Sequence, residues 1–269
     1  MKIDLHNHTI HSDGILTEEE LIKRAVNNKV DIFALTDHDS VFGCDNIEKI
    51  AKNYNVRVIK GLELSTIYKG ESIHIVCLFK DNIIPEKMIE FSNEYKNKRL
   101  KRAIDMLKKI HEIYGLKIDE KDLLADSEVL TRANIMRHIA KLNNLTFDEA
   151  KKYISPSSKA YIPSTKMTVE EGLKFIHDSN AIAILAHPCL IKNPDYVEEL
   201  VKLGFDGIEV RYPKYIHLEP HFRALANKYN LLCSAGSDCH GDETHADIGT
   251  ATIDESDFIP IANKLNFKL

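Results

Sequence analysis

Histidine and aspartate are concentrated near the start of the chain, in the segment DLHNHTIHSDG of residues 4–14. The segment holds a His-x-His pair, His6 and His8, followed by His11 and Asp13. Imidazole and carboxylate groups together suit Zn²⁺, Mn²⁺ or Fe²⁺, so the segment could bind a metal ion. With 13 histidines in 269 residues such a pair is close to a chance event, and the rest of the chain must decide.

Residues of the same types recur where strand-like segments end. Apolar and β-branched residues predict strands at 2–6, 31–36, 56–64, 72–79, 181–187 and 206–210, and residues 231–240 predict a further strand that runs into a polar loop. Residues with metal-ligand side chains lie within or directly after these segments: His6, His8, Asp13, Asp37, His38, Asp39, Glu63, His74, His187, Asp238 and His240. The carboxyl ends of the strands share one face in a parallel α/β fold, so we expect these side chains to converge.

Six histidines and three carboxylates of this set are the predicted ligands: His6, His8, His38, His74, His187, His240, Asp13, Glu63 and Asp238. A single tetrahedral zinc ion accepts about four ligands. We therefore expect two or three divalent ions, Mn²⁺, Zn²⁺ or Fe²⁺, with one carboxylate shared between two of them.

Helical segments separate most of the predicted strands and indicate an α/β fold with a parallel sheet, open or closed into a barrel. Capping boxes at 17–20 and 168–171 each begin a helix. Between about residues 85 and 153 only helical patterns occur. We expect three segments: 1–84 as the first part of the barrel, 85–167 as a helical insertion that contributes to substrate binding, and 168–269 as the second part.

Charge is spread unevenly along the chain. Residues 92–168 contain 16 Lys and Arg against 10 Asp and Glu, whereas the remainder contains 20 against 31. A lysine-rich solvated surface would explain this, and so would a basic insertion above an acidic metal-binding core. The second interpretation would suit an anionic substrate.

Composition excludes some classes of protein. No apolar run approaches the ~18 residues of a membrane span, and no basic stretch followed by an apolar one begins the chain. The five cysteines include no Cys-x-x-Cys pair, which favours reduced thiols. We expect a cytoplasmic protein without a membrane partner, and no obligate protein partner is inferred.

Six spaced motifs resemble the polymerase and histidinol phosphatase (PHP) family of metal-dependent phosphoesterases. They are DLHNHTIHSDG, LTDHDS, GLELS, HIVCLF, LAHP and GSDCHG, in the family's order. Within the insertion, TRANIMRHIA and KAYIP resemble the subgroup that hydrolyses nucleoside 3′,5′-bisphosphates and, in some members, short RNA from the 5′ end. Ala133 stands where that subgroup more often has proline.

This resemblance implies a distorted (β/α)7 barrel and a site for three ions. By motif position, His6, His8, Glu63 and Asp238 would hold the first ion. Glu63 would bridge to a second ion that His74 and His187 complete. The third would be held by Asp13, His38 and His240.

A phosphoesterase mechanism follows as an expectation. Clustered ions lower the pKa of bound water and neutralise phosphoryl oxygens, so a metal-bound hydroxide is the expected nucleophile. His11 could donate a proton, or could instead support a ligand. His245 and Asp247 follow the last motif, where hydrogen bonding within the loop is the slightly favoured interpretation.

A nucleoside bisphosphate would need cationic groups for its second phosphate, and arginine pairs with two phosphate oxygens at once. Arg132 is the first candidate by motif position, and Lys159, Arg137 and Arg211 are weaker ones. Tyr161 or Tyr212 could stack on a base.

Three alternatives remain open from the sequence. Histidinol-phosphate phosphatase fits less well. Its substrate has one phosphate and a cationic end, which a basic insertion would not favour. An amidohydrolase-type deaminase also begins with a His-x-His pair, but the nine predicted ligands of this chain fit that class of enzyme poorly. A metal-dependent nucleotide sensor would bind a nucleotide without releasing phosphate.

Overall fold

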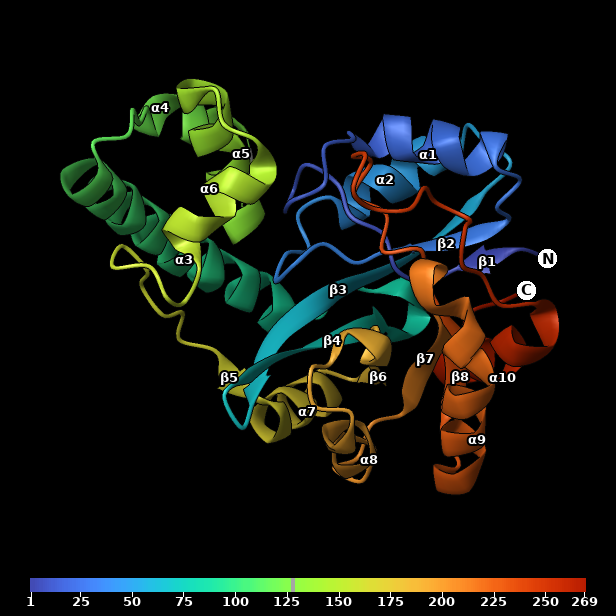
Figure 1. Ribbon diagram of the computed structural model, residues 1–269. Coiled ribbons are helices and arrows are strands. Elements are labelled where there is room, and N and C mark those ends of the chain that lie inside the picture. The colour runs from blue at the N-terminus through green and yellow to red at the C-terminus, as the bar shows by residue number, and fades with distance from the viewer. Residues whose placement is uncertain (127–128) are drawn as a thin grey trace.

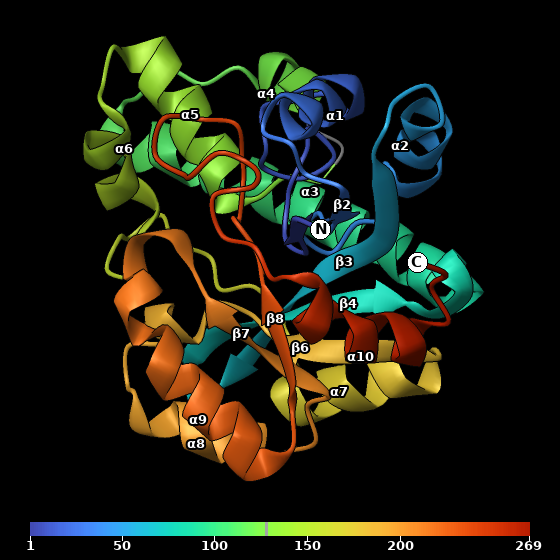
Figure 2. The same ribbon diagram turned by 90° about the vertical axis from the view of Figure 1, so that its right-hand side faces the viewer.

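A computed structural model describes residues 1–126 and 129–269. Within these residues, eight strands form one sheet. Seven follow the order β1-β2-β3-β4-β6-β7-β8, and the eighth, β5, pairs with β3 beside this path. The bounds are β1 Ile3–Asp4, β2 Ile32–Leu35, β3 Arg57–Tyr68, β4 Glu71–Phe79, β5 Met167–Thr168, β6 Ala181–Leu185, β7 Gly207–Arg211 and β8 Leu232–Ala235. The sheet curls on itself, with β1 and β8 brought near each other (Figures 1 and 2).

The two edges of the sheet are joined just beyond the end strands. The backbone N–H of Leu5 donates to the carbonyl of Ala235 at 3.0 Å, and Asn7 forms a parallel bridge with Cys239. Gly236 permits this closure, because a Cβ atom there would lie 2.1 Å from the Cβ of His6. The predicted distorted seven-stranded barrel is thereby confirmed.

The expectation of a parallel sheet is wrong for β4. This strand runs antiparallel to both of its neighbours, β3 and β6. It follows β3 through a tight turn at Lys69 and Gly70, where no helix intervenes, so the chain must reverse direction. His74 consequently reaches the site from an antiparallel strand, paired opposite Ser65 of β3.

Helices cover the outside of the barrel and close one end of it. They are α1 Glu18–Asn27, α2 Cys44–Ala51, α7 Val169–Asp178, α8 Asp195–Val201, α9 Glu219–Tyr229 and α10 Glu255–Leu265. Both predicted capping boxes, at Thr17 and Thr168, are present. Phe258 and Ile261 of α10 belong to the same buried apolar cluster as Ile3 and Ile182. The helix α10 therefore covers this cluster, and it lies beside β6 and β8 (Figure 2).

Four helices form a separate body beside the barrel: α3 Glu86–Tyr114, α4 Glu120–Asp126, α5 Arg132–Asn143 and α6 Phe147–Ile154 (Figure 1). They share a core of their own that includes Met106, Ile110, Ile135 and Ile154. The first half of α3 packs instead on the barrel, where Phe91 joins the main core. A single long helix therefore anchors this helical body to the barrel.

Short 3-10 helices complete the connections: η1 Lys80–Asn82, η2 Pro188–Leu190 and η3 Pro213–Leu218. All five cysteines are free. In the described part of the chain, the helices are too short or too polar for any of them to cross a membrane.

Candidate metal centre

The barrel gathers all nine predicted ligands at one mouth. His6 and His8 follow β1, His38 follows β2, His187 follows β6, and Asp238 and His240 follow β8. Glu63 and His74 project from within β3 and β4, and Asp13 lies in the loop that precedes α1. Eight of the nine fall into three overlapping groups whose ligand atoms lie within 4.8 Å of one another.

Glu63 lies at the centre of the cluster and is fully buried. Its Oε2 atom lies 3.3 Å from His6 Nε2, 3.4 Å from His8 Nε2 and 2.8 Å from His38 Nδ1. Its Oε1 atom lies 3.0 Å from His74 Nδ1 and 2.9 Å from His187 Nε2. One carboxylate therefore contacts five imidazole rings, as a group shared between ions would.

A second carboxylate, Asp238, completes the group of His6, His8 and Glu63. Asp238 Oδ1 lies 3.1 Å from His8 Nε2 and 3.6 Å from His6 Nε2. The four residues are buried and offer two nitrogens and two oxygens toward one point. Mixed nitrogen and oxygen ligands of this kind suit Zn²⁺, Mn²⁺ or Fe²⁺.

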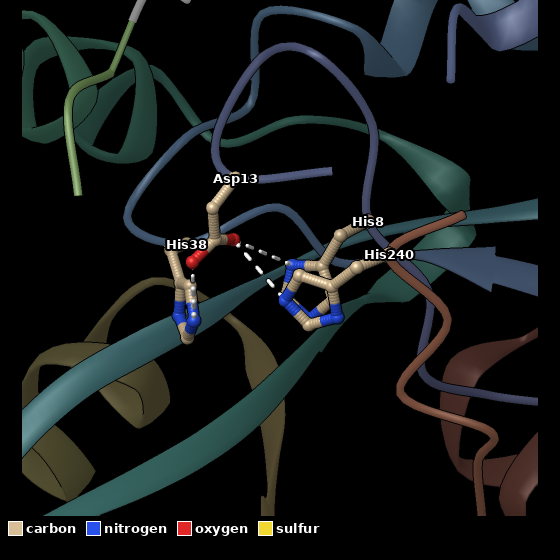
Figure 3. A group of neighbouring side chains, drawn as sticks. All are labelled: His8, Asp13, His38 and His240. Carbon is tan, nitrogen blue, oxygen red and sulfur yellow. Dashed lines mark ion pairs between the residues drawn. The ribbon is translucent and has the colours of Figure 1, made fainter. Parts of the chain in front are cut away.

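Asp13 organises the neighbouring group with three histidines, His8, His38 and His240 (Figure 3). Its Oδ1 atom lies 3.2 Å from His240 Nε2 and 3.9 Å from His8 Nδ1, and its Oδ2 atom lies 3.7 Å from His38 Nε2. His8 and His38 thus each turn one ring nitrogen toward Asp13 and the other toward Glu63. The two groups are adjacent and share these two rings.

Burial and mutual contact shift the protonation of the cluster. Burial would raise the pKa values of Asp13, Glu63 and Asp238, but the adjacent rings hold them well below the usual range. Burial lowers the pKa of His8 to about 3. Burial also opposes protonation of His240, but its contacts with Asp13 and Asp238 together raise the pKa of His240 to about 10. The carboxylates are therefore ionised at neutral pH and attract positive charge, from protons or from metal ions.

Four buried atoms of the cluster form no hydrogen bond within the described residues, although each lies 2.8–3.3 Å from an atom of another ligand. They are His6 Nε2, Asp13 Oδ1, His38 Nδ1 and Glu63 Oε2. Buried polar atoms are normally hydrogen-bonded, so unsatisfied ones need another partner. All four are ligand atoms of the groups described above, and a divalent ion would supply that partner. The residues present therefore fit metal ions.

Residues behind the cluster hold its members in place. Glu209 Oε1 lies 2.9 Å from His6 Nδ1, and Glu209 Oε2 accepts from the backbone N–H of His187 at 2.5 Å. The hydroxyl of Tyr212 donates to Asp238 Oδ2 at 3.0 Å. Carboxylates that orient a ligating imidazole in this way are typical of metal sites.

Backbone strain is also concentrated here. His187 and Asp238 have positive φ angles of 29° and 51°, which non-glycine residues rarely adopt. Such conformations cost on the order of 1–3 kcal/mol and persist where the surrounding structure enforces them. In both residues the strain turns a ligating side chain toward the cluster.

A cavity of about 1020 Å³ opens beside Asp13, His38 and His74 and extends under the helical body. Positive side chains dominate the part of its lining nearest the cluster: Arg99, Arg102, Arg132 and Lys166. Lys166 Nζ donates to Ser72 Oγ at 2.5 Å, and Ser72 Oγ lies 3.2 Å from His74 Nε2. This hydrogen-bonded chain connects the cationic lining to a predicted metal ligand.

Lys166 and Arg99 have different surroundings. Burial lowers the pKa of Lys166 to about 8, with Arg99 acting in the same direction although Asp39 opposes it. Arg99 is paired with the buried Asp39 and also donates to Ser65 Oγ. The sequence did not single out Arg99, Lys166 or Glu209. Charged residues on a long helix, after a loop and inside a buried strand carry no distinguishing local pattern.

Some of the predicted substrate-binding residues line the cavity, and others make contacts elsewhere. Arg132 and Tyr161 line the cavity. Arg137 donates to the backbone carbonyl of Asp13 and so supports the ligand loop. Lys159 is exposed and does not belong to the cavity lining. Arg211 is held by Glu219 at 2.7 Å and by the carbonyl of Thr252 at 2.6 Å.

Of the other residues considered near the motifs, only His245 joins a possible ligand group among the described residues. His11 lies 3.0 Å from Glu18 and outside the ligand groups, in a supporting position. His245 stacks on His240 at 3.9 Å and forms a further possible group with Asp238 and His240. Asp247 accepts from Asn28 at 3.0 Å and from the backbone N–H of Ile248, so its role is loop hydrogen bonding.

A distorted α/β barrel with clustered histidines and carboxylates at its mouth defines a metal-dependent hydrolase. The PHP domain family model matches residues 4–170, and the chain belongs to this family. A 5′-3′ exoribonuclease of Haemophilus influenzae is 33% identical over 249 residues, which cover 89% of this chain and 90% of that one. A 3′,5′-nucleoside bisphosphate phosphatase of Chromobacterium violaceum is 28% identical over 258 residues, which cover 92% and 90%.

Solved structures agree on the fold. A structure described as a metal-dependent phosphoesterase of Bifidobacterium adolescentis superimposes with a TM-score of 0.85 over 97% of this chain and 96% of that one, at 21% identity. Together the comparisons make the chain a phosphoesterase, a hydrolase that acts on phosphoric ester bonds. These relatives do not favour histidinol-phosphate phosphatase or a sensor without turnover.

Proposed function

We propose that this enzyme hydrolyses the phosphate ester on the 3′ oxygen of 5′-phosphorylated nucleotides, from nucleoside 3′,5′-bisphosphates to short RNA. The observation that carries the proposal is the position of Arg99, Arg102, Arg132 and Lys166 beside the ligand cluster, along one cavity. A substrate with two phosphates can place one at the cluster and the other among these cations. The names of two relatives, a bisphosphate phosphatase and a 5′-3′ exoribonuclease, describe such substrates.

Three ion positions are proposed within the cluster. His6, His8, Glu63 and Asp238 would hold the first, and Glu63, His74 and His187 the second. The third would be held by Asp13, His38 and His240, with His8 at its edge. When bound, Mn²⁺, Zn²⁺ or Fe²⁺ ions in such clusters lower the pKa of water and neutralise phosphoryl oxygens.

The chain's own residues supply positioning. Arg132, at the start of α5, and Lys166 would neutralise the 5′-phosphate and hold the nucleotide in one orientation. Glu209 fixes the ring of His6, and Tyr212 fixes one oxygen of Asp238. Tyr161, which lines the cavity beneath Arg102, would contact the base.

One reaction accounts for both substrate types. Water adds to the phosphorus, the bond between phosphorus and the 3′ oxygen breaks, and that oxygen takes up a proton. A bisphosphate then yields a 5′-mononucleotide and inorganic phosphate. An RNA yields a 5′-mononucleotide and a strand shortened by one residue that carries a new 5′-phosphate.

A phosphate-release and product panel tests the proposal directly. Purified protein with Mn²⁺ would be given adenosine 3′,5′-bisphosphate, a 5′-phosphorylated trinucleotide, its 5′-hydroxyl counterpart and histidinol phosphate. We expect turnover of the first two and at least about tenfold lower kcat/KM for the last two, because both lack the 5′-phosphate that the cations would hold. Preference for histidinol phosphate would contradict the proposal.

A further inference from the structure

The cavity continues past the ligand cluster, away from the helical body. Its far part lies between the β3–β4 turn, η2 and the start of α8, and we call it the hairpin lobe. Six of its lining residues are Ile67, Lys69, Leu190, Lys192, Asn193 and Tyr196. Small-ligand pockets measure about 300–1,000 Å³, so a cavity of 1020 Å³ is slightly larger than that range. The nucleotide proposed above leaves the hairpin lobe without an assigned ligand.

A fixed aromatic ring forms one wall of the hairpin lobe. The Tyr196 ring packs edge to face on Tyr68, with 5.5 Å between centroids, and Lys69 Nζ lies 5.0 Å from the Tyr196 centroid. Both Lys69 Nζ and the hydroxyl of Tyr68 donate to Glu199 Oε2, at 2.5 and 2.8 Å. These contacts hold the half-buried Tyr196 ring in place before any ligand binds.

Apolar side chains from two other elements line the same lobe. Ile67 of β3 is 36% exposed and Leu190 of η2 is 44% exposed, although both are large and hydrophobic. With Tyr196 they provide apolar surface to a single cavity from three separate segments. A planar nucleobase has two apolar faces and stacks on tyrosine, so it matches this surface.

The charge of the cavity differs between its two parts. Five cations, Arg99, Arg102, Arg132, Lys151 and Lys166, line the part near the helical body, whereas two cations, Lys69 and Lys192, and the carboxylate of Glu71 line the hairpin lobe. Lys69 is also paired with Glu199. A terminal phosphate carries up to two negative charges and a diester only one. The charges therefore place the 5′ end near the helical body and the diester backbone in the hairpin lobe.

We propose that the hairpin lobe binds the nucleotide on the 3′ side of the scissile phosphate of a single-stranded RNA. Its base stacks on Tyr196 between Ile67 and Leu190, and Lys192 contacts its backbone. The inference rests on the proposed function and extends it, because it makes an oligonucleotide a better substrate than a bisphosphate. Combining a stacking ring with cations is how proteins bind single strands without sequence preference.

The test compares substrates of increasing length in matched variants. We would measure kcat/KM for adenosine 3′,5′-bisphosphate and for a 5′-phosphorylated trinucleotide in the wild type, Tyr196→Ala, Tyr196→Phe and Lys192→Ala. Tyr229→Ala is the control, because Tyr229 is also half-buried, has Lys228 Nζ 5.2 Å from its ring centroid and does not line the cavity. The bisphosphate rate of each variant reports whether its fold and metal centre are intact.

We expect Tyr196→Ala to lower kcat/KM about tenfold for the trinucleotide, with a change of less than twofold for the bisphosphate. Tyr196→Phe keeps the ring and should retain most activity. Lys192→Ala should lower kcat/KM for the trinucleotide, by a larger factor at low salt than at high salt. Equal loss on both substrates, or none, would overturn the inference and leave the proposed function standing. Absence of turnover with every nucleotide in the wild type would overturn both.

Discussion

Glu63 Oε1 lies 2.9 Å from His187 Nε2, although 124 residues separate the two positions in the chain. Glu63 belongs to β3 and His187 follows β6, so their contact joins the part of the barrel before the helical body to the part after it. In the sequence, the helical body lies between these two residues, and the chain returns from it to the barrel before His187. The metal centre therefore requires both parts of the barrel to be in place.

Glu63→Gln should lower kcat/KM by more than about 100-fold. Residues that merely orient a ligand contribute about 10–100-fold, and Glu63 contacts five imidazole rings itself. An amide is neutral and cannot hold two ions together. Phosphate release and bound metal per chain are the measurements, with Glu90→Gln on the exposed surface of α3 as the control. Full activity of Glu63→Gln would rule out its central role.

His187→Ala and Asp238→Asn should each abolish hydrolysis while leaving the fold intact, since both side chains lie at the barrel mouth outside the apolar core. Circular dichroism and thermal unfolding would establish that the fold survives. Hydrolysis that persists in chelator-treated wild-type protein would be inconsistent with metal-dependent chemistry.

Arg132→Ala should raise KM for a nucleoside 3′,5′-bisphosphate about 10- to 100-fold, the effect of losing a hydrogen bond between charged groups. KM for a substrate with a single phosphate should change little, because that phosphate occupies the ligand cluster. Lys159→Ala provides the comparison, since Lys159 is exposed and outside the cavity lining. An equal rise in KM for both substrates would remove the role assigned to Arg132.

Much of this site was predictable because ligand types recur at strand ends, and strand ends converge in a barrel. All nine predicted ligands lie in one cluster, and the capping boxes at Thr17 and Thr168 form as expected. The direction of β4 was not predictable from apolar content, which is the same for parallel and antiparallel strands. Only the two-residue turn at Lys69 and Gly70 indicates the reversal.

The surroundings of other residues depend on contacts between distant segments. Arg211 follows a strand as the ligands do, but Glu219 of the next helix binds its guanidinium group. His245 makes the expected hydrogen bonds within its loop, to Asp242 at 2.9 and 3.0 Å, and its additional stacking on His240 emerges only from the fold of that loop. Glu209 is concealed in a buried strand, where its partner His6 is 203 residues away.

Glu209→Gln should weaken metal binding about 10- to 100-fold without removing a ligand atom. The carboxylate holds the His6 ring and the backbone of His187, and a neutral amide would orient them less firmly. Competition with a chelator measures the affinity, and excess metal should restore most of the activity. Glu198→Gln on α8 is the matched control. Unchanged affinity would show that Glu209 is not needed to position the ligands.

Metal affinity should rise with pH. Burial opposes protonation of His240, but its contacts with Asp13 and Asp238 together outweigh burial and raise the pKa of His240 to about 10. In metal-free protein a proton therefore occupies this ring at neutral pH, and an ion must displace it. Affinity should increase up to about tenfold per pH unit for each proton released between pH 6.5 and 9. A flat profile of Mn²⁺ competition against pH would contradict this protonation state.

The same shift predicts the stability of chelated protein. The folded-state pKa of His240 exceeds its unfolded value of about 6.5, so its stabilising contribution is complete below pH 6.5 and is lost as pH rises toward 10. Thermal unfolding between these limits would show it as a falling Tm for the chelated protein. Replacing His240 with Gln should flatten this dependence.

The most direct test is the metal content of freshly purified, active protein, measured by elemental analysis on the same sample as phosphate release from adenosine 3′,5′-bisphosphate. Overlapping ligand groups around Glu63 and Asp13 predict two to three divalent ions per chain, and activity that falls as a chelator removes them. One ion per chain in fully active protein would contradict the multinuclear centre.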